Sequence, residues 1–146
     1  MDELFKDKEV LFGVLSGRAS TAINRRLYRD FRANDLAITP EQWTILLFLS
    51  FGDGINQQEL ANITFKDRPS ITRLLDKLEK AALIVRLADK TDKRTNLVYI
   101  TKTGLSTAQK ARTIALDTMK IALNGITEEE VKFGEQILKK IFKNLE

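Results

Sequence analysis

The chain has 146 residues, 43% of them hydrophobic, which suits about one domain with a packed core and excludes disorder throughout. It contains no Cys and no His, so it builds no disulfide, thiol redox switch or metal site from these side chains. We expect neither a metal nor a cofactor. Residues 1–6 include acids, and nowhere do about 18 apolar residues occur consecutively, so we expect a soluble cytoplasmic protein without a membrane partner.

The formal net charge of +4 is concentrated in one segment of the chain. Residues 66–94 contain nine basic and five acidic residues, and the rest of the chain is balanced. A concentrated excess of this kind is typical of a surface that binds polyphosphate. The alternative is a basic face exposed only to solvent.

The first predicted element is a long helix over residues 10–32. Its apolar residues mostly follow a three-to-four spacing and are Leu11, Leu15, Ile23, Leu27 and Phe31. Its other faces carry Arg18, Arg25, Arg26, Arg29 and Arg32. These arginines either extend into solvent or contact a partner chain or a DNA backbone.

Two short capped helices are predicted next. Residues 39–42 supply a Thr N-cap, a Pro at the first helical position and a Gln three residues after the cap, which opens an apolar helix through residue 51. Residues 52–54 end this helix with two glycines. A second capping box at residues 56–59 starts another short helix. Two short capped helices separated by glycines predict a helix-turn-helix.

A third helix is predicted over residues 67–82, with Asp67 as N-cap and Pro69 in the first turn. At about 100° per residue, one face collects the apolar side chains Ile71, Leu74, Leu75, Leu78 and Ala82. The opposite face carries Thr72, Arg73, Asp76, Lys77 and Lys80. Small or basic residues in the outward first turns are typical of a helix that reads base edges, where Arg makes bidentate bonds to guanine.

A β-hairpin is predicted after this helix, from a strand at 83–87, a basic loop at 88–96 and a strand at 97–101. Asp92 can accept hydrogen bonds from the backbone or from Arg94 and hold the loop tip in shape. Arg94 is then the expected probe of a minor groove. The alternative is an ordinary surface hairpin. The order of the elements predicts a winged DNA reader in a chain that is mainly helical with one small sheet.

Two more long helices are predicted over residues 105–123 and 127–145, the second opened by a capping box. The apolar stripe of the last helix consists of Val131, Leu138, Ile141, Phe142 and Leu145. Such terminal helices have no obvious core to cover within a single chain, so the pattern indicates a helical partner. Packing within the chain is the alternative.

Two motifs carry a resemblance to a known family. The run Asp92-Lys93-Arg94 followed by Val98-Tyr99-Ile100-Thr101-Lys102-Thr103-Gly104 is similar to an acidic-x-Arg wing that leads into a helix start, and residues 71–80 followed by 83–86 form the second match. Together they make residues 36–101 resemble winged-helix transcriptional regulators of the MarR family, and the resemblance extends across almost the whole chain.

Ala82 departs from the family pattern, which usually has Gly at this place. Gly suits a helix end that needs positive φ, a conformation that costs a residue with a Cβ roughly 1 kcal/mol. Either this helix ends differently or Ala82 bears strain.

The resemblance implies a mainly α fold with a small β-hairpin. Residues 1–35 and 102–146 would supply dimerisation helices, and residues 36–101 a winged helix-turn-helix lobe. In a two-fold homodimer the recognition helices lie roughly 34 Å apart, so the operator is expected to be a pseudo-palindrome. The expected function is a sequence-specific DNA-binding transcriptional regulator, a ligand-responsive repressor and not an enzyme. Non-specific DNA coating or protein contacts through the same fold are the alternative.

Two sets of residues are assigned to double-stranded DNA in this hypothesis. On the recognition helix, contacts with bases or nearby phosphates are expected from Ser70, Thr72 and Arg73, and contacts with the DNA backbone from Lys66, Arg68 and Lys77. On the wing, the assigned residues are Lys90, Asp92, Lys93 and Arg94.

The resemblance also implies a small aromatic or anionic effector, bound between the dimerisation helices and the lobe, that changes the spacing of the two reading heads. Arg18, Tyr28 and Trp43 are cationic or aromatic and are candidates to line such a pocket. Core packing or surface exposure of these three side chains is the alternative. The absence of Cys excludes the thiol-oxidising subtype of the family.

Overall fold

The computed structural model describes residues 6–146, and residues 1–5, the start of the predicted N-terminal region, lie outside the described residues. The elements in chain order are α1 (Lys8–Ala33), α2 (Pro40–Phe51), β1 (Ile55–Asn56), α3 (Gln57–Ile63), α4 (Arg68–Lys80), β2 (Ile84–Ala88), β3 (Asn96–Ile100), α5 (Lys102–Ala122) and α6 (Glu128–Leu145). The predicted fold class, mainly helical with one small sheet, is confirmed. Among the described residues, no helix is both long and apolar enough to cross a membrane.

Short polar side chains start the helices of the lobe, largely as predicted. Thr39 Oγ1 accepts the N–H of Gln42 at 3.2 Å, and Gln42 Oε1 accepts the N–H of Thr39 at 2.9 Å, so the first capping box is confirmed. At α3, the Asn56 side chain accepts the N–H of Glu59 at 2.7 Å, but the return bond is missing and the second predicted box is only half formed. Asp67 caps α4 as expected.

Three helices end on a left-handed residue that is not glycine. The φ angles are 58° at Asp35, 52° at Phe65 and 58° at Ala82. After α4, the N–H of Leu83 donates to the carbonyl of Leu78 at 3.0 Å, which is the hydrogen bond of a Schellman helix end. Of the two possibilities stated for Ala82, the structure shows the strained one.

The sheet has three antiparallel strands in the order β1-β3-β2. The hairpin of β2 and β3 was predicted, whereas β1 was not, because two residues are too few to show an alternating pattern. Ile55 of β1 pairs with Val98 of β3. Since α3 begins at Gln57, directly after β1, this pairing fixes the first turn of α3 beside the base of the wing.

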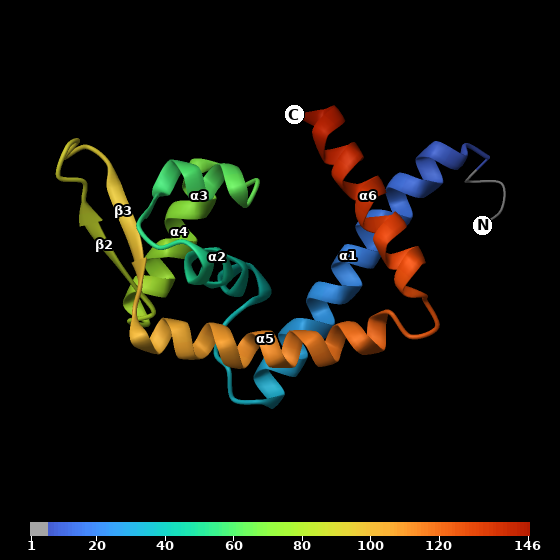
Figure 1. Ribbon diagram of the computed structural model, residues 1–146, viewed down its shortest axis with the longest axis horizontal. Helices are drawn as coiled ribbons and strands as arrows, with labels where there is room; N and C mark the ends of the chain where they lie inside the picture. The colour runs from blue at the N-terminus through green and yellow to red at the C-terminus, as the bar shows by residue number, and fades with distance from the viewer. Residues whose placement is uncertain (1–5) are drawn as a thin grey trace.

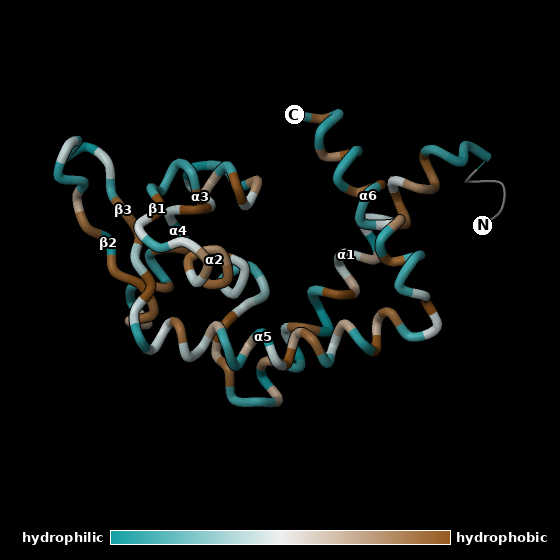
Figure 2. Tube along the Cα trace, viewed as in Figure 1, coloured by the Kyte–Doolittle hydropathy of each residue, from teal (hydrophilic) through white to brown (hydrophobic). Residues whose placement is uncertain are grey.

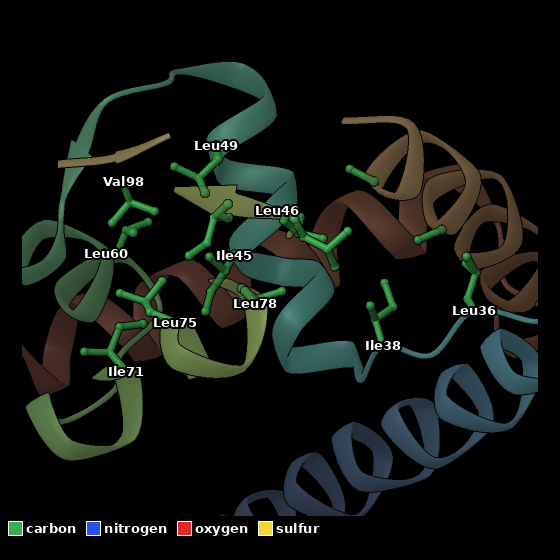
Figure 3. Close-up of a cluster of buried hydrophobic side chains, with 14 of the residues drawn as sticks. Leu36, Ile38, Ile45, Leu46, Leu49, Leu60, Ile71, Leu75, Leu78 and Val98 are labelled. Atoms are coloured by element: carbon green, nitrogen blue, oxygen red, sulfur yellow. The ribbon is translucent and has the colours of Figure 1, made fainter. Parts of the chain in front are cut away.

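The core of the lobe lies where α2, α3, α4 and the sheet meet. Figure 3 shows the buried side chains converging there, among them Ile45, Leu46, Leu49, Leu60, Ile71, Leu75, Leu78 and Val98. After its polar first turn, helix α2 is mostly hydrophobic (Figure 2), and it buries Ile45, Leu46 and Leu49. The tight packing of this core fixes the orientation of α4 relative to the wing.

Helix α5 connects the lobe to the terminal helices (Figure 1). It packs against α2 and α1 through the small buried residues Ala108, Ala111 and Ala115, which allow a close approach of the helices. Beyond it, α6 has no buried residue among those described, and it touches the lobe where the Phe142 ring lies 5.3 Å from the Phe65 ring.

Candidate nucleic-acid interface

Helix α4 turns its polar face to solvent. Its buried face consists of Ile71, Leu75 and Leu78. On the other face, Arg73 Nη2 donates to Ser70 Oγ at 3.3 Å. The N–H of Ser70 donates to Asp67 at 2.7 Å, and this bond is the main reason why the pKa of Asp67 lies below its ordinary value. The first two turns of α4 therefore present Ser70, whose N–H is held by the N-cap Asp67, and the exposed Arg73.

A polar hollow of about 330 Å³ lies between α3, α4 and the wing. Its lining residues are Gln57, Gln58, Arg68, Thr72, Arg94, Thr95 and Asn96. The structure thus brings together three residues that the sequence assigned to DNA from separate segments, Arg68, Thr72 and Arg94. The other four were missed. The adjacent polar pair Gln57 and Gln58 was visible in the sequence, but it had been interpreted only as part of a helix start.

Both glutamines of α3 contact α4 across this hollow. Gln57 Nε2 donates to Thr72 Oγ1 at 2.7 Å. Arg68 Nε donates to Gln58 Oε1 at 3.0 Å. Helix α3 therefore supports the first turns of α4 with two side-chain hydrogen bonds in addition to the core beneath them.

The wing tip is shaped by its acidic residues. Asp92 Oδ1 accepts the backbone N–H of Arg94 at 3.0 Å, and Asp92 Oδ2 accepts Thr95 Oγ1 at 3.3 Å. Asp89 accepts the N–H and the hydroxyl of Thr91, and the N–H of Thr91 is the main cause of the lowered pKa of Asp89. Of the two roles expected for Asp92, the structure shows the bond to the backbone. In the part of the chain that is described, no carboxylate forms an ion pair with Arg94.

Arg86 fixes the wing to α4. Its Nη2 lies 2.6 Å from Asp76 Oδ1 and 2.9 Å from Glu79 Oε1, and its backbone N–H donates to Glu79 at 3.2 Å. The guanidinium lowers the pKa of Glu79, chiefly by hydrogen bonding. Arg86 contributed to the basic excess that was counted in the sequence, but here its charge is neutralised within the lobe.

The remaining basic residues lie in different surroundings. Lys66 Nζ pairs with Glu41 Oε1 of α2 at 3.2 Å. Lys77 lines a second hollow, away from the wing. Lys90 and Lys93 are exposed in the wing loop. The polar hollow therefore collects only part of the predicted recognition-helix set. Lys66, Ser70, Arg73 and Lys77 are not among its lining residues.

The three residues proposed for an effector pocket do not line one cavity. Tyr28 lines the second hollow, of about 530 Å³, together with Arg25 and Lys77. Arg18 lines a different surface hollow on α1. Trp43 packs edge-on against Phe31 with ring centroids 5.9 Å apart, and its buried Nε1 has no hydrogen-bond partner among residues 6–146.

Comparisons with known proteins agree with this geometry. The model of the MarR family matches residues 38–95. An uncharacterized HTH-type transcriptional regulator, YybA of Bacillus subtilis, is 30% identical over 112 residues, which are 77% of this chain and 75% of the relative. The HTH-type transcriptional regulator FarR of Neisseria gonorrhoeae is 39% identical over 71 residues, 49% of each chain.

A solved structure extends the likeness over nearly the full length. It is that of a mutant of MarR from E. coli in complex with operator DNA, which has a TM-score of 0.84, 25% identity, and coverage of 94% of this chain and 97% of that chain. All three named relatives are regulators rather than enzymes. This chain belongs to the MarR family and is a winged helix-turn-helix transcriptional regulator.

Proposed function

We propose that the protein is a ligand-responsive homodimeric repressor that binds a pseudo-palindromic operator sequence-specifically. The observation that carries the proposal is the polar hollow in which Arg68 and Thr72 of α4 and Arg94 of the wing face a common space. A helix and a hairpin that border one polar hollow suit a duplex whose backbone passes between them, with the helix in the major groove and the wing in the minor groove. The similar E. coli protein, solved in complex with operator DNA, supports DNA as the partner.

The roles on DNA follow from the placement of each side chain. Ser70, Thr72 and Arg73 are proposed to contact base edges or the nearest phosphates, because they lie on the outward first turns of α4. Arg68 and Arg94 flank the polar hollow and are proposed to contact phosphate and the minor groove, respectively.

The lysines are proposed to act from the edges of the interface. Lys90 and Lys93 would contact the DNA backbone from the wing tip, whose loop is held in shape by Asp92. Lys66 and Lys77 are exposed enough to contribute to the field around the duplex, although Lys66 is paired with Glu41 in the free protein. We expect smaller losses of affinity on replacing these four than on replacing Arg94, since long-range charge is screened by salt.

A second copy of the chain is proposed to cover the terminal helices. We assign residues 1–35 and 102–146 to dimerisation and residues 36–101 to DNA binding. The exposed apolar side chains of α1, α5 and α6 include Val10, Phe12, Leu15, Leu116, Ile121, Phe133, Leu138 and Leu145. Between α5 and α6 lies an open, largely apolar hollow of about 750 Å³. A two-fold partner buries this surface and places two copies of α4 in successive major grooves.

The second hollow is proposed as the effector site. It lies between α1, the start of α2 and α4, where a bound molecule can shift the lobe relative to the dimerisation helices. Arg25 and Lys77 favour an anion there, and the exposed Tyr28 ring favours an aromatic group. Arg32 holds that ring in place, with its guanidinium 5.6 Å from the ring centroid and Nη1 donating to the Tyr28 hydroxyl at 3.0 Å.

The test is selection of bound genomic fragments with the purified protein, followed by titration of the best sequence and a scrambled duplex at several salt concentrations. The proposal expects a pseudo-palindrome preferred by about 10³-fold or more. Equal and steeply salt-dependent binding to both duplexes would show non-specific coating instead. No binding by the effector-free protein would direct attention to protein contacts. Repression is tested with a reporter whose promoter overlaps the selected site, where the protein must lower transcription.

A further inference from the structure

The hydroxyl of Thr72 is oriented differently from those of several other helical threonines. A threonine in a helix commonly donates its hydroxyl to the carbonyl one turn earlier. In this chain Thr21, Thr44 and Thr113 do so, with distances of 2.9, 2.9 and 3.3 Å. Thr72 forms no such bond. Its Oγ1 accepts a hydrogen bond from Gln57 Nε2 at 2.7 Å, across the gap between α3 and α4.

The bond to Gln57 leaves the hydroxyl hydrogen of Thr72 available. The amide N–H of Gln57 occupies one lone pair of Oγ1, and within residues 6–146 the hydroxyl has no acceptor of its own. Thr72 is half-buried and lines the polar hollow beside Arg94 and Asn96. The hydroxyl is thus held at the edge of the proposed DNA surface with its hydrogen unused.

The position of Gln57 explains why it can hold this geometry. Gln57 is the first residue of α3, and the preceding strand β1 is paired with β3 of the wing. Its backbone is therefore fixed by the sheet before it and by the helix after it. Figure 1 shows α3 next to α4 and β3 at the top of the lobe. Gln57 is half-buried, which limits the competition of water for the bond to Thr72.

We propose that Gln57 is a positioning residue for DNA recognition, which fixes the Thr72 hydroxyl as a hydrogen-bond donor toward an acceptor atom of the DNA. The inference rests on the proposed placement of α4 against DNA. Acceptors at hand are the N7 and O6 atoms of guanine, N7 of adenine and O4 of thymine in the major groove, and the oxygens of the nearest phosphate. The amino group of cytosine is a donor and would not satisfy this hydroxyl as well.

Four variants of the full-length protein test the role of Gln57: Thr72→Val, Gln57→Ala, the double variant and Gln57→Glu. Their affinities are measured for the selected operator and for a library in which each base pair is changed in turn. Thr113→Val is the matched control, since its hydroxyl bonds only to its own helix on α5. Circular dichroism and thermal unfolding show whether each variant folds.

If the proposal is right, Thr72→Val and Gln57→Ala each weaken operator binding by about 5-fold, the worth of one hydrogen bond, and the double variant is no weaker than Thr72→Val. Gln57→Glu keeps a bond between the two helices, but its carboxylate accepts the Thr72 hydrogen. If the acceptor is a base edge, Gln57→Glu must therefore lose discrimination at the same base pair as Thr72→Val, whereas the added negative charge alone, on a merely structural Gln57, weakens binding to every sequence alike. Thr113→Val leaves the profile unchanged.

The pattern of the loss identifies the acceptor. Loss of discrimination at one base pair shows a base edge, and an equal loss on every sequence shows a phosphate oxygen. The proposal is overturned if Thr72→Val changes binding while Gln57→Ala does not, or if neither does. Failure of the wild-type protein to bind DNA at all would instead overturn the proposed function, so the two failures are distinguishable.

Discussion

Thr118 of α5 donates its hydroxyl to Asp30 of α1 at 2.6 Å, across 88 positions of sequence. Both Asp30 oxygens also lie 3.0 Å from Arg26 Nε on the same helix. The bond from Thr118 is the main cause of the lowered pKa of Asp30, with Arg26 adding to the effect. This pair ties α5, which carries the lobe, to the long N-terminal helix.

Thr118→Val is expected to destabilise the fold by about 1 kcal/mol at neutral pH, because a part-buried carboxylate loses a donor. The folded-state pKa of Asp30 lies below its ordinary value of 3.8, so the pair stabilises the fold above that pH and the contribution is lost as the pH falls through the folded-state pKa. The difference between wild type and variant in urea unfolding must therefore shrink as the pH is lowered below about 3.8.

The exposed Thr113→Val on the same helix serves as the control and is expected to change stability little at any pH. A difference between Thr118→Val and wild type that stayed constant down to acidic pH would contradict the assigned role of Asp30.

Ala82→Gly is expected to stabilise the protein by about 0.5 to 1 kcal/mol, since φ is 58° at this position and glycine adopts that conformation without a Cβ clash. The neighbouring Ala81 is the matched control, because its φ of −80° suits an L-residue. Ala81→Gly should destabilise by up to about 1 kcal/mol. Both are compared by denaturant unfolding at one protein concentration. Equal effects of the two glycines would show that Ala82 is not strained.

The features predictable from sequence were those determined by neighbouring residues. The N-caps Thr39 and Asp67 are local, because the capping side chain bonds an N–H three residues later. At Ala82, the residue type alone left two possibilities, a different helix end or strain, and only the φ of 58° decides for strain. Periodicity gave the helices and the hairpin, since each buries one face.

The features missed depend on partners far away in sequence. Strand β1 exists because Ile55 meets Val98, and its two residues carry no pattern of their own. Gln57 and Thr72 bond only because the core sets α3 against α4. The neutralisation of Arg86 likewise required the register of β2 against α4, so a count of charges overstated the free basic surface.

Gly104→Ala is expected to destabilise the protein by several kcal/mol, more than a typical substitution. A Cβ at residue 104 would overlap the carbonyl oxygen of Leu83 and lie 2.8 Å from Ile100 Cγ1, so α5 would have to move away from the sheet. Gly52→Ala is the control, since a Cβ there has nothing within 4 Å. Thermal unfolding of both variants measures the contrast. A Gly104→Ala protein as stable as wild type would show that α5 does not pack this closely on the wing base.

Arg94→Ala is expected to weaken operator binding by about 10-fold and to reduce the slope of log affinity against log salt by about 1. Among the described ion pairs none involves Arg94, so its charge is available to DNA. Lys110→Ala on α5 removes the same charge from an exposed residue that does not line the polar hollow, and should leave both quantities nearly unchanged. The measurement is a fluorescence titration at four salt concentrations. Equal losses in the two variants would indicate a general effect of net charge and not a wing contact.

Leu138→Glu is expected to convert the proposed dimer to monomers, because the side chain is 58% exposed in the single chain and lies on the apolar stripe of α6. Burial of an unpaired carboxylate at an interface costs several kcal/mol. Gln136→Glu is the control, since it adds the same charge on the opposite side of the helix. Sedimentation velocity gives the mass of each variant.

DNA binding by Leu138→Glu distinguishes a folded monomer from a protein in which α6 is misfolded. A folded Leu138→Glu monomer retains one α4 and one wing, so it should bind a single half-site weakly while losing most of its preference for the full pseudo-palindrome. If Leu138→Glu remained dimeric and bound the full site like wild type, α6 would not form the dimer interface. Since the lobe does not contain Leu138, a variant that loses even half-site binding must be checked for unfolding by circular dichroism before the result is assigned to the interface.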